Sequence, residues 1–95
     1  MNSDYRFKRG DVVVSFRGHD RNKFLVVTES FGDSVIVADG RTRPLEKAKM
    51  KNVRHVRFVA HSREIAEAIE NGTLSDAEIR RVIGECDKSA VKKFR

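Results

Sequence analysis

The side chains in this sequence that could do chemistry are mostly cations, and the first group of them follows a short apolar run. Residues 17–23 read Arg-Gly-His-Asp-Arg-Asn-Lys, with three cations and a glycine that leaves the backbone accessible. Proteins bind phosphate oxygens with long cationic side chains, backbone N–H groups and Asn-type donors. The segment therefore predicts a phosphate-binding turn, and the alternative is a solvated turn without a ligand. The residues that we expect to contact phosphate here are Arg17, His19, Arg21, Asn22 and Lys23.

A second basic segment spans residues 41–57, where seven cations stand against the single acid Glu46. If residues 47–51 are extended, the alternating lysines share one side of the chain and form a row that matches phosphates along a strand. The alternative is a lysine-rich loop that binds nothing. The cations of this segment are Arg41, Arg43, Lys47, Lys49, Lys51, Arg54 and Arg57.

The distribution of charge supports a polyanion-binding face. The 95 residues carry a formal net charge of +6, with 13 Lys and Arg against 7 Asp and Glu in residues 1–58, and 7 against 7 in residues 59–95. The whole excess therefore lies in the first part of the chain. Such asymmetry is typical of proteins that bind polyanions. A merely basic, soluble protein is the alternative.

The sequence contains no residue pattern that is typical of a catalytic site or of a metal site. His19 and Asp20 are neighbours, but adjacency does not orient an imidazole against a carboxylate, and no motif places a nucleophile. Cys86 with scattered histidines lacks the ligand spacing of a zinc site. The glycines form neither a P-loop nor a dinucleotide-binding pattern. We therefore expect no enzyme activity, no cofactor and no metal.

Short apolar runs rich in β-branched residues predict the strands that position these cations. Turn residues separate them closely enough that a small barrel is the economical closure, because closure removes exposed sheet edges. Most aromatic side chains fall within the strand patterns and are expected in the core, so Phe31 is the best exposed candidate for base stacking. The expected strands are 11–17, 24–28, 35–38 and 53–59, with turns at 18–23, 31–34 and 39–40 and a loop at 47–52.

Two helices are predicted after the strands. Ser62 caps the first, over residues 63–70, and Asn71-Gly72 ends it. Ser75 and Glu78 fit a capping box at the start of the second. We expect residues 1–60 to form the barrel, 61–87 a helical hairpin packed on or beside it, and 88–95 a frayed basic tail. The apolar stripes of the hairpin either pack on the barrel or present themselves to a protein partner; they are Ile65 with Ile69, and Ile79 with Val82 and Ile83.

The compartment is predicted from cysteine usage and hydropathy. Cys86 is the only cysteine and is expected in the apolar stripe of the second helix. No apolar run approaches the ~20 residues that span a bilayer, and no charged-then-apolar leader pattern is found. We expect a cytoplasmic monomer without a membrane partner.

The strand–turn–strand region resembles the KOW motif. Gly10–Ser15, Gly18-His19-Asp20 and Val26-Val27 carry the likeness, and residues 37–47 resemble the corresponding stretch of small bacterial KOW-domain proteins and of archaeal and eukaryotic large-subunit ribosomal proteins. The similarity covers residues 7–58 and implies an SH3-like barrel with an RNA or ribosome association. The motif usually has a glycine where this chain has Asn22, and Asn tolerates the left-handed backbone that such a position requires.

Together these features predict a mainly β protein, an SH3-like (KOW) β-barrel followed by a C-terminal helical hairpin. The expected function is binding of ribosomal or other structured RNA through its phosphate backbone, with the ribosome or ribosomal proteins as further partners. The alternative is a protein-interaction adaptor in translation or transcription, with RNA binding secondary.

Overall fold

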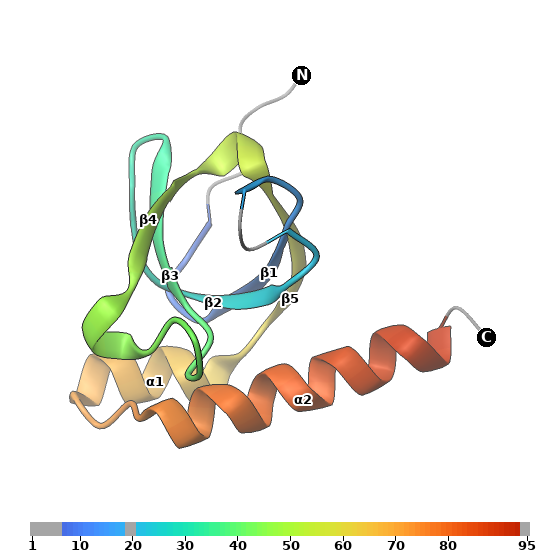
Figure 1. Ribbon diagram of the computed structural model, residues 1–95. Helices are drawn as coiled ribbons and strands as arrows, with labels where there is room; N and C mark the ends of the chain where they lie inside the picture. The colour runs from blue at the N-terminus through green and yellow to red at the C-terminus, as the bar shows by residue number, and fades with distance from the viewer. Residues whose placement is uncertain (1–6, 19–20, 94–95) are drawn as a thin grey trace.

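The protein is a small, mainly β domain in which two helices follow a five-stranded antiparallel sheet (Figure 1). The computed structural model describes residues 7–18 and 21–93, with the backbone alone for 89–93. The sheet order is β4-β3-β2-β1-β5, which places β4 and β5 at its two edges. The strands are β1 (Asp11–Ser15), β2 (Phe24–Phe31), β3 (Ser34–Ala38), β4 (Lys49–Asn52) and β5 (Val56–His61). The helices are α1 (Arg63–Asn71) and α2 (Asp76–Lys93), and two short 3-10 turns are η2 (Leu45–Lys47) and η3 (Val53–His55).

The sheet is strongly curved, as Figure 1 shows, and η3 connects its two edge strands directly. The register shifts between Val12 and Val13 in the β1–β5 pair, and between Val27 and Glu29 in the β2–β3 pair. Such bulges bend a strand and increase its twist. They bring the end of β4 within one short turn of the beginning of β5.

Two apolar cores lie on opposite faces of this sheet. Consecutive residues of a strand point to opposite faces, so Val12 and Val13 enter different cores, as do Val26 and Val27. Strands buried on both faces read as continuous apolar runs rather than strict alternation. The inner core contains Phe7, Val13, Leu25, Val27, Val35, Val37 and Val56. The outer core, between sheet and helices, contains Val12, Val26, Ala38, Ile65, Ile79 and Val82.

The predicted first helix is confirmed with its local signals. The Ser62 hydroxyl accepts a hydrogen bond from the Ile65 N–H at 3.1 Å, and the chain leaves the helix at Gly72. At α2, the Ser75 hydroxyl accepts from the Glu78 N–H at 3.2 Å, which is one half of the predicted capping box. The Glu78 carboxyl lies beside Glu64 instead of reaching back, and its pKa is raised by desolvation and by that neighbour.

The apolar stripes of both helices pack on the sheet. Ile65 and Ile79 are fully buried in the outer core, and Ile69 and Ile83 pack against it. The surfaces that the adaptor hypothesis offered to a protein partner are therefore occupied within the chain. Within the described ranges, neither helix is long and apolar enough to cross a membrane.

Residues 88–95 were predicted to form a frayed tail, and in the structure α2 continues to Lys93. Residues 88–93 (Lys-Ser-Ala-Val-Lys-Lys) contain no glycine or proline and include good helix formers. In Figure 1 this end of α2 projects beyond the sheet.

Candidate nucleic-acid interface

The first predicted binding element is a tight turn between β1 and β2. Asn22 has φ of 67°, so the left-handed conformation expected at this position is confirmed. Its N–H donates to the Ser15 carbonyl at 2.6 Å, and the Ser15 N–H donates to the Lys23 carbonyl at 3.0 Å. These bonds close the turn and leave Arg17 and Arg21 exposed. His19 and its neighbour Asp20 lie outside the described residues.

The second element is the turn after β3, which the Asp39 carboxylate organises. It accepts hydrogen bonds from the backbone N–H groups of Arg41 and Arg43, both at 2.8 Å, and from the Thr42 hydroxyl at 3.1 Å. Burial raises the pKa of this carboxyl, but the two backbone hydrogen bonds, Thr42 and nearby Lys23 outweigh burial, so the pKa lies below its ordinary value. The turn holds Arg41 exposed and Arg43 half-buried.

The two turns are joined to each other and to β4. The Lys23 ammonium donates to the Thr42 hydroxyl at 3.1 Å. The Lys51 ammonium crosses to the Arg17 carbonyl at 3.2 Å. The three basic segments are far apart in sequence, and these hydrogen bonds link them into one connected surface. This surface surrounds the open side of the curved sheet, between β4 and the 17–23 turn. We call this surface the basic rim; it comprises residues 16–18, 21–23, 39–43 and 47–57.

Of the lysines predicted to form one row at 47, 49 and 51, Lys49 and Lys51 share a face of β4, whereas Lys47 lies in η2. Residues 49–52 form strand β4, where a loop was predicted, because they pair with β3. Lys49 lies opposite Val37 and Lys51 opposite Val35, so both point to the inner face, and Lys51 is only 8% exposed. Lys47 belongs to η2 and is exposed. The neighbouring outward position on β4 is Met50, which is 55% exposed.

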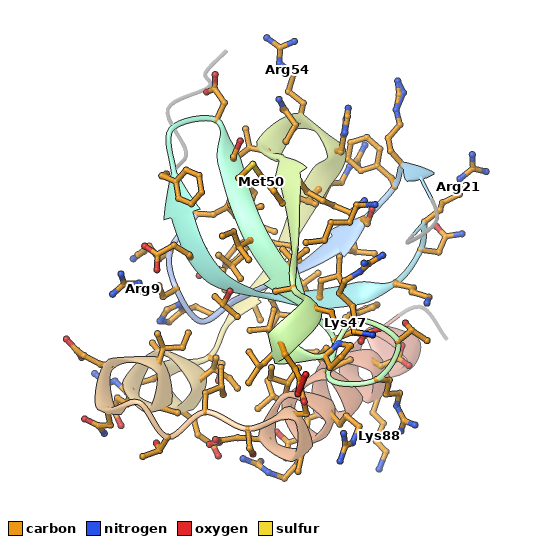
Figure 2. All side chains as sticks on the ribbon, turned by 60° about the vertical axis from the view of Figure 1, so that its left-hand side comes forward. Arg9, Arg21, Lys47, Met50, Arg54 and Lys88 are labelled. Atoms are coloured by element: carbon orange, nitrogen blue, oxygen red, sulfur yellow. The ribbon has the colours of Figure 1, made fainter. Side chains whose placement is uncertain are left out.

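The first part of the predicted strand 53–59 also differs, because residues 53–55 form the 3-10 turn η3 and β5 begins only at Val56. The Asn52 side chain caps this turn by accepting from the Arg54 N–H at 2.8 Å. Arg54 is therefore held exposed at one end of the sheet. Figure 2 shows Arg54, Arg21 and Lys47 projecting from different parts of the basic rim, with Arg9 across the molecule from Arg21.

Sequence reasoning missed an aromatic residue in this surface. Phe16 was expected in the core, but it follows the end of β1 and is 39% exposed. The Arg57 guanidinium lies 5.2 Å from the centroid of its ring. A cation stacked on an aromatic face is a preformed platform on which an RNA base can stack. The only sequence signal was the position of Phe16 beside Arg17, where the apolar run ends.

The exposed cations of the basic rim are not neutralised by described carboxylates. The ion pairs that join described residues are Arg9–Glu29, His61–Asp11, and Arg81 with Glu64 and Glu85. All of them lie outside the basic rim. The exposed or half-buried cations of the basic rim without an ion pair to a described carboxylate include Arg17, Arg21, Lys23, Arg41, Lys47, Lys49, Arg54 and Arg57.

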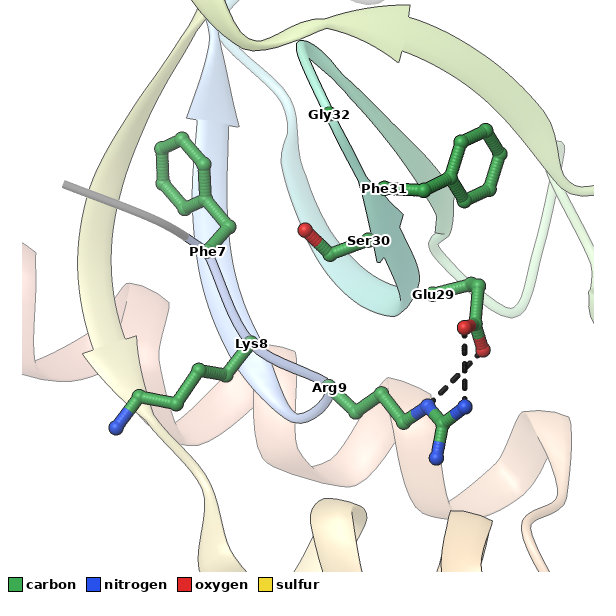
Figure 3. Close-up of a pocket in the computed structure, with 7 residues that line it drawn as sticks. All are labelled: Phe7, Lys8, Arg9, Glu29, Ser30, Phe31 and Gly32. Atoms are coloured by element: carbon green, nitrogen blue, oxygen red, sulfur yellow. Dashed lines mark hydrogen bonds and ion pairs between the residues drawn. The ribbon is translucent and has the colours of Figure 1, made fainter. Parts of the chain in front are cut away.

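Phe31 is exposed as predicted, at 46%, but it belongs to a different cleft (Figure 3). This cleft of about 310 Å³ lies between residues 7–9 and the end of β2. Arg9 and Glu29 form a bidentate pair there, with Nε–Oε1 at 2.9 Å and Nη2–Oε2 at 3.0 Å. Phe31 therefore lies in a cleft where the lining arginine already has a carboxylate partner.

Groups suited to metal binding or to nucleophilic catalysis are few among the described residues. Among residues 7–18 and 21–93, no three His, Cys, Asp or Glu side chains gather as metal ligands would. Cys86 packs against the outer core, and its burial raises the pKa of the thiol. A thiol whose pKa is raised is a poor nucleophile at neutral pH.

Comparison with known proteins adds no family to this geometry: neither a family model nor a curated protein matches the sequence.

Proposed function

We propose that this protein binds structured RNA, chiefly through the phosphate backbone, as a KOW-type SH3-like barrel. One observation carries the proposal: hydrogen bonds from Lys23 and Lys51 join three basic segments into the basic rim. The exposed arginines of this surface have no carboxylate partners among the described residues. Unpaired cations on a connected surface attract and hold a polyanion.

The barrel assignment rests on the curvature of the sheet and on the KOW-like residues 7–58. η3 links the two edge strands, and the inner core fills the space that the sheet encloses. The Phe16 N–H donates to the His55 carbonyl at 3.1 Å, which ties the end of β1 to this link. In the proposed barrel the open side between β4 and the 17–23 turn faces the RNA.

The proposed partner is ribosomal or other structured RNA in the cytoplasm, bound by a monomer in the context of translation. Phosphate contacts fix orientation without reading sequence. About four to six such contacts predict that the logarithm of affinity falls with the logarithm of salt concentration with a slope of about −3 to −5.

The test compares charge reversals that change net charge equally. Arg21→Glu and Arg41→Glu alter the basic rim, and Arg63→Glu alters an exposed cation at the start of α1. We expect each rim variant to lower affinity for a stem–loop RNA at least tenfold at 50 mM salt, and Arg63→Glu to lower it less than threefold, as measured by fluorescence anisotropy. Equal losses from all three variants would show that only overall charge matters and would remove the basic rim as the site. A protein complex that salt does not weaken, found without RNA binding, would favour the adaptor function instead.

A further inference from the structure

A second cleft opens beside the basic rim, where its two turns approach α2. Its volume is about 330 Å³. Lys23, Phe24 and Arg41 line it from the sheet side, and Arg80, Ile83 and Gly84 line it from α2. The second helix contributed no charge excess to the sequence pattern, so nothing in the sequence placed it beside the cations.

The walls of this cleft are fixed by contacts between the 39–43 turn and α2, which lie side by side in Figure 1. The Arg80 guanidinium donates to the Gly40 carbonyl at 2.7 Å. Gly40 also approaches α2 so closely that a Cβ there would lie 2.6 Å from the Asp76 carbonyl oxygen. In addition, the Asp76 carboxylate accepts from the Leu45 N–H at 2.8 Å. The turn and the helix therefore hold their separation without a ligand.

Gly84 is the unexplained residue of this cleft. It lies within the 18-residue helix α2, where glycine is among the poorest helix formers. A Cβ at this position would meet no atom within 4 Å, so close packing does not require glycine. Its φ is not positive either, so the backbone conformation does not require it. What the missing side chain does provide is open space against the helix backbone inside the cleft.

The lining suits a ligand with one flat apolar part and one anionic part. Phe24 is half-buried and offers ring surface, and Gly84 leaves room beside it. Lys23, Arg41 and Arg80 supply cationic donors at the margin. The Asp39 carboxylate is already occupied by its own turn. A nucleobase joined to a phosphate combines these properties, since bases stack on aromatic rings and phosphates bind to Lys and Arg.

We propose that this cleft binds a single unpaired nucleotide, with its base between Phe24 and the Gly84 backbone and its phosphate on Lys23 and Arg41. The proposal rests on the proposed RNA-binding function and deepens it, because the basic rim binds the RNA backbone and the cleft adds recognition of one extruded base. Asp87, an exposed carboxylate at the edge of the cleft, is placed to accept a hydrogen bond from an exocyclic amino group.

The test fills the cleft without weakening the helix. Gly84→Leu introduces a good helix former whose side chain occupies the space of the base. Ala77→Leu places the same side chain at an exposed position of α2 and serves as the matched control. Affinities are measured for two RNA duplexes that differ only in one bulged adenosine, and circular dichroism confirms that both variants fold.

The native protein and Ala77→Leu should bind the bulged RNA more tightly than the fully paired RNA, by between about fivefold and a hundredfold, which is the range for one stacked base. Gly84→Leu should lose this preference and keep its affinity for the paired RNA. When both RNAs bind the native protein, a preference that survives in Gly84→Leu, or that the native protein lacks, would overturn the binding of an extruded RNA base in the cleft while the basic rim stands.

A titration with adenosine monophosphate, followed through the NMR signals of Gly84 and Phe24, separates a free nucleotide from one within RNA. Millimolar binding that Gly84→Leu abolishes supports the cleft even if neither RNA binds, in which case only the proposed RNA function fails. A bulge preference without binding of the free nucleotide assigns the cleft to RNA alone. If adenosine monophosphate leaves both signals unchanged and the native protein shows no bulge preference, the cleft binds no nucleotide.

Discussion

Two clefts lined by described residues have similar volumes, about 310 Å³ and 330 Å³, and each is lined by phenylalanine, arginine and carboxylate side chains. In the first cleft, the Glu29 carboxylate accepts hydrogen bonds from the Arg9 guanidinium, and this contact lowers the pKa of Glu29. In the second, Arg41 has no carboxylate partner among the described residues. The residue types alone would make the two clefts equally good candidates for binding a phosphate. The pairing of charges distinguishes them, because a cation already held by a carboxylate has little left to offer a phosphate.

The largest expected effect is a loss of stability when a glycine at the wall of a cleft is replaced by alanine. Gly40 and Gly32 both have positive φ, 80° and 58°, and each lies beside or within one cleft. Gly40→Ala should destabilise the protein by about 2–4 kcal/mol, because the left-handed strain adds to a clash with the Asp76 backbone. Gly32→Ala should cost about 1–2 kcal/mol, since its added Cβ meets nothing within 4 Å. Urea denaturation measures both, and equal losses would mean that the turn does not hold closely to α2.

The aromatic residues test whether charge pairing decides where RNA bases stack. Phe16→Ala should weaken binding of a stem–loop with an unpaired loop by about 1–3 kcal/mol, because it removes one stacking surface from the basic rim. Phe31→Ala should change this affinity by less than about 0.3 kcal/mol, since Phe31 lies beside a neutralised arginine. Fluorescence anisotropy titrations measure the RNA affinity of both variants. A loss at Phe31 as large as that at Phe16 would break the distinction between the two regions.

A smaller effect should follow from releasing Arg9. Glu29→Gln leaves an exposed guanidinium at the first cleft, so affinity for RNA at 50 mM salt should rise about threefold and the salt slope should steepen by about 1. Glu67→Gln removes the same charge from an exposed site on α1 and provides the control. A gain of the same size in both variants would reflect net charge only.

The smallest effect concerns pH. The pKa of Asp39 in the folded protein lies below its ordinary value of 3.8. Its contribution to stability is therefore complete above that value and is lost as the pH falls through the lowered folded pKa. The amide signals of Arg41 and Arg43 should shift with this titration in NMR spectra, and Asp39→Asn should abolish the shift. Signals that follow a titration at or above 3.8 would show that the hydrogen bonds of the turn do not favour the charged carboxylate.

Local signals were sufficient for several elements of the fold. β-branched runs predicted β1, β2 and β3, and the serine caps predicted where the helices start. The turn geometry at Asn22 also followed from sequence, because the preference for positive φ belongs to the residue itself.

Features that depend on pairing between distant segments were not predictable in this way. β4 reads Lys-Met-Lys-Asn, and only its register with β3 makes it a strand and turns Lys51 inward. The exposure of Phe16 depends on where the sheet ends rather than on alternation. Arg80 reaches the 39–43 turn through a contact that spans forty residues of sequence. Each of these positions is set by the partner segment, and the local pattern carries no information about that partner.

The outward valines and alanine of the sheet have a consequence for synthesis of the chain. Val12, Val26 and Ala38 pack against Ile79 and Val82, which lie in the last quarter of the sequence. A nascent chain that has released only the five strands exposes this apolar strip to water, and such surface promotes aggregation. Folding on the ribosome therefore cannot be completed until most of α2 has emerged from the exit tunnel. A truncation after β5 should accumulate as insoluble material rather than as a smaller stable domain.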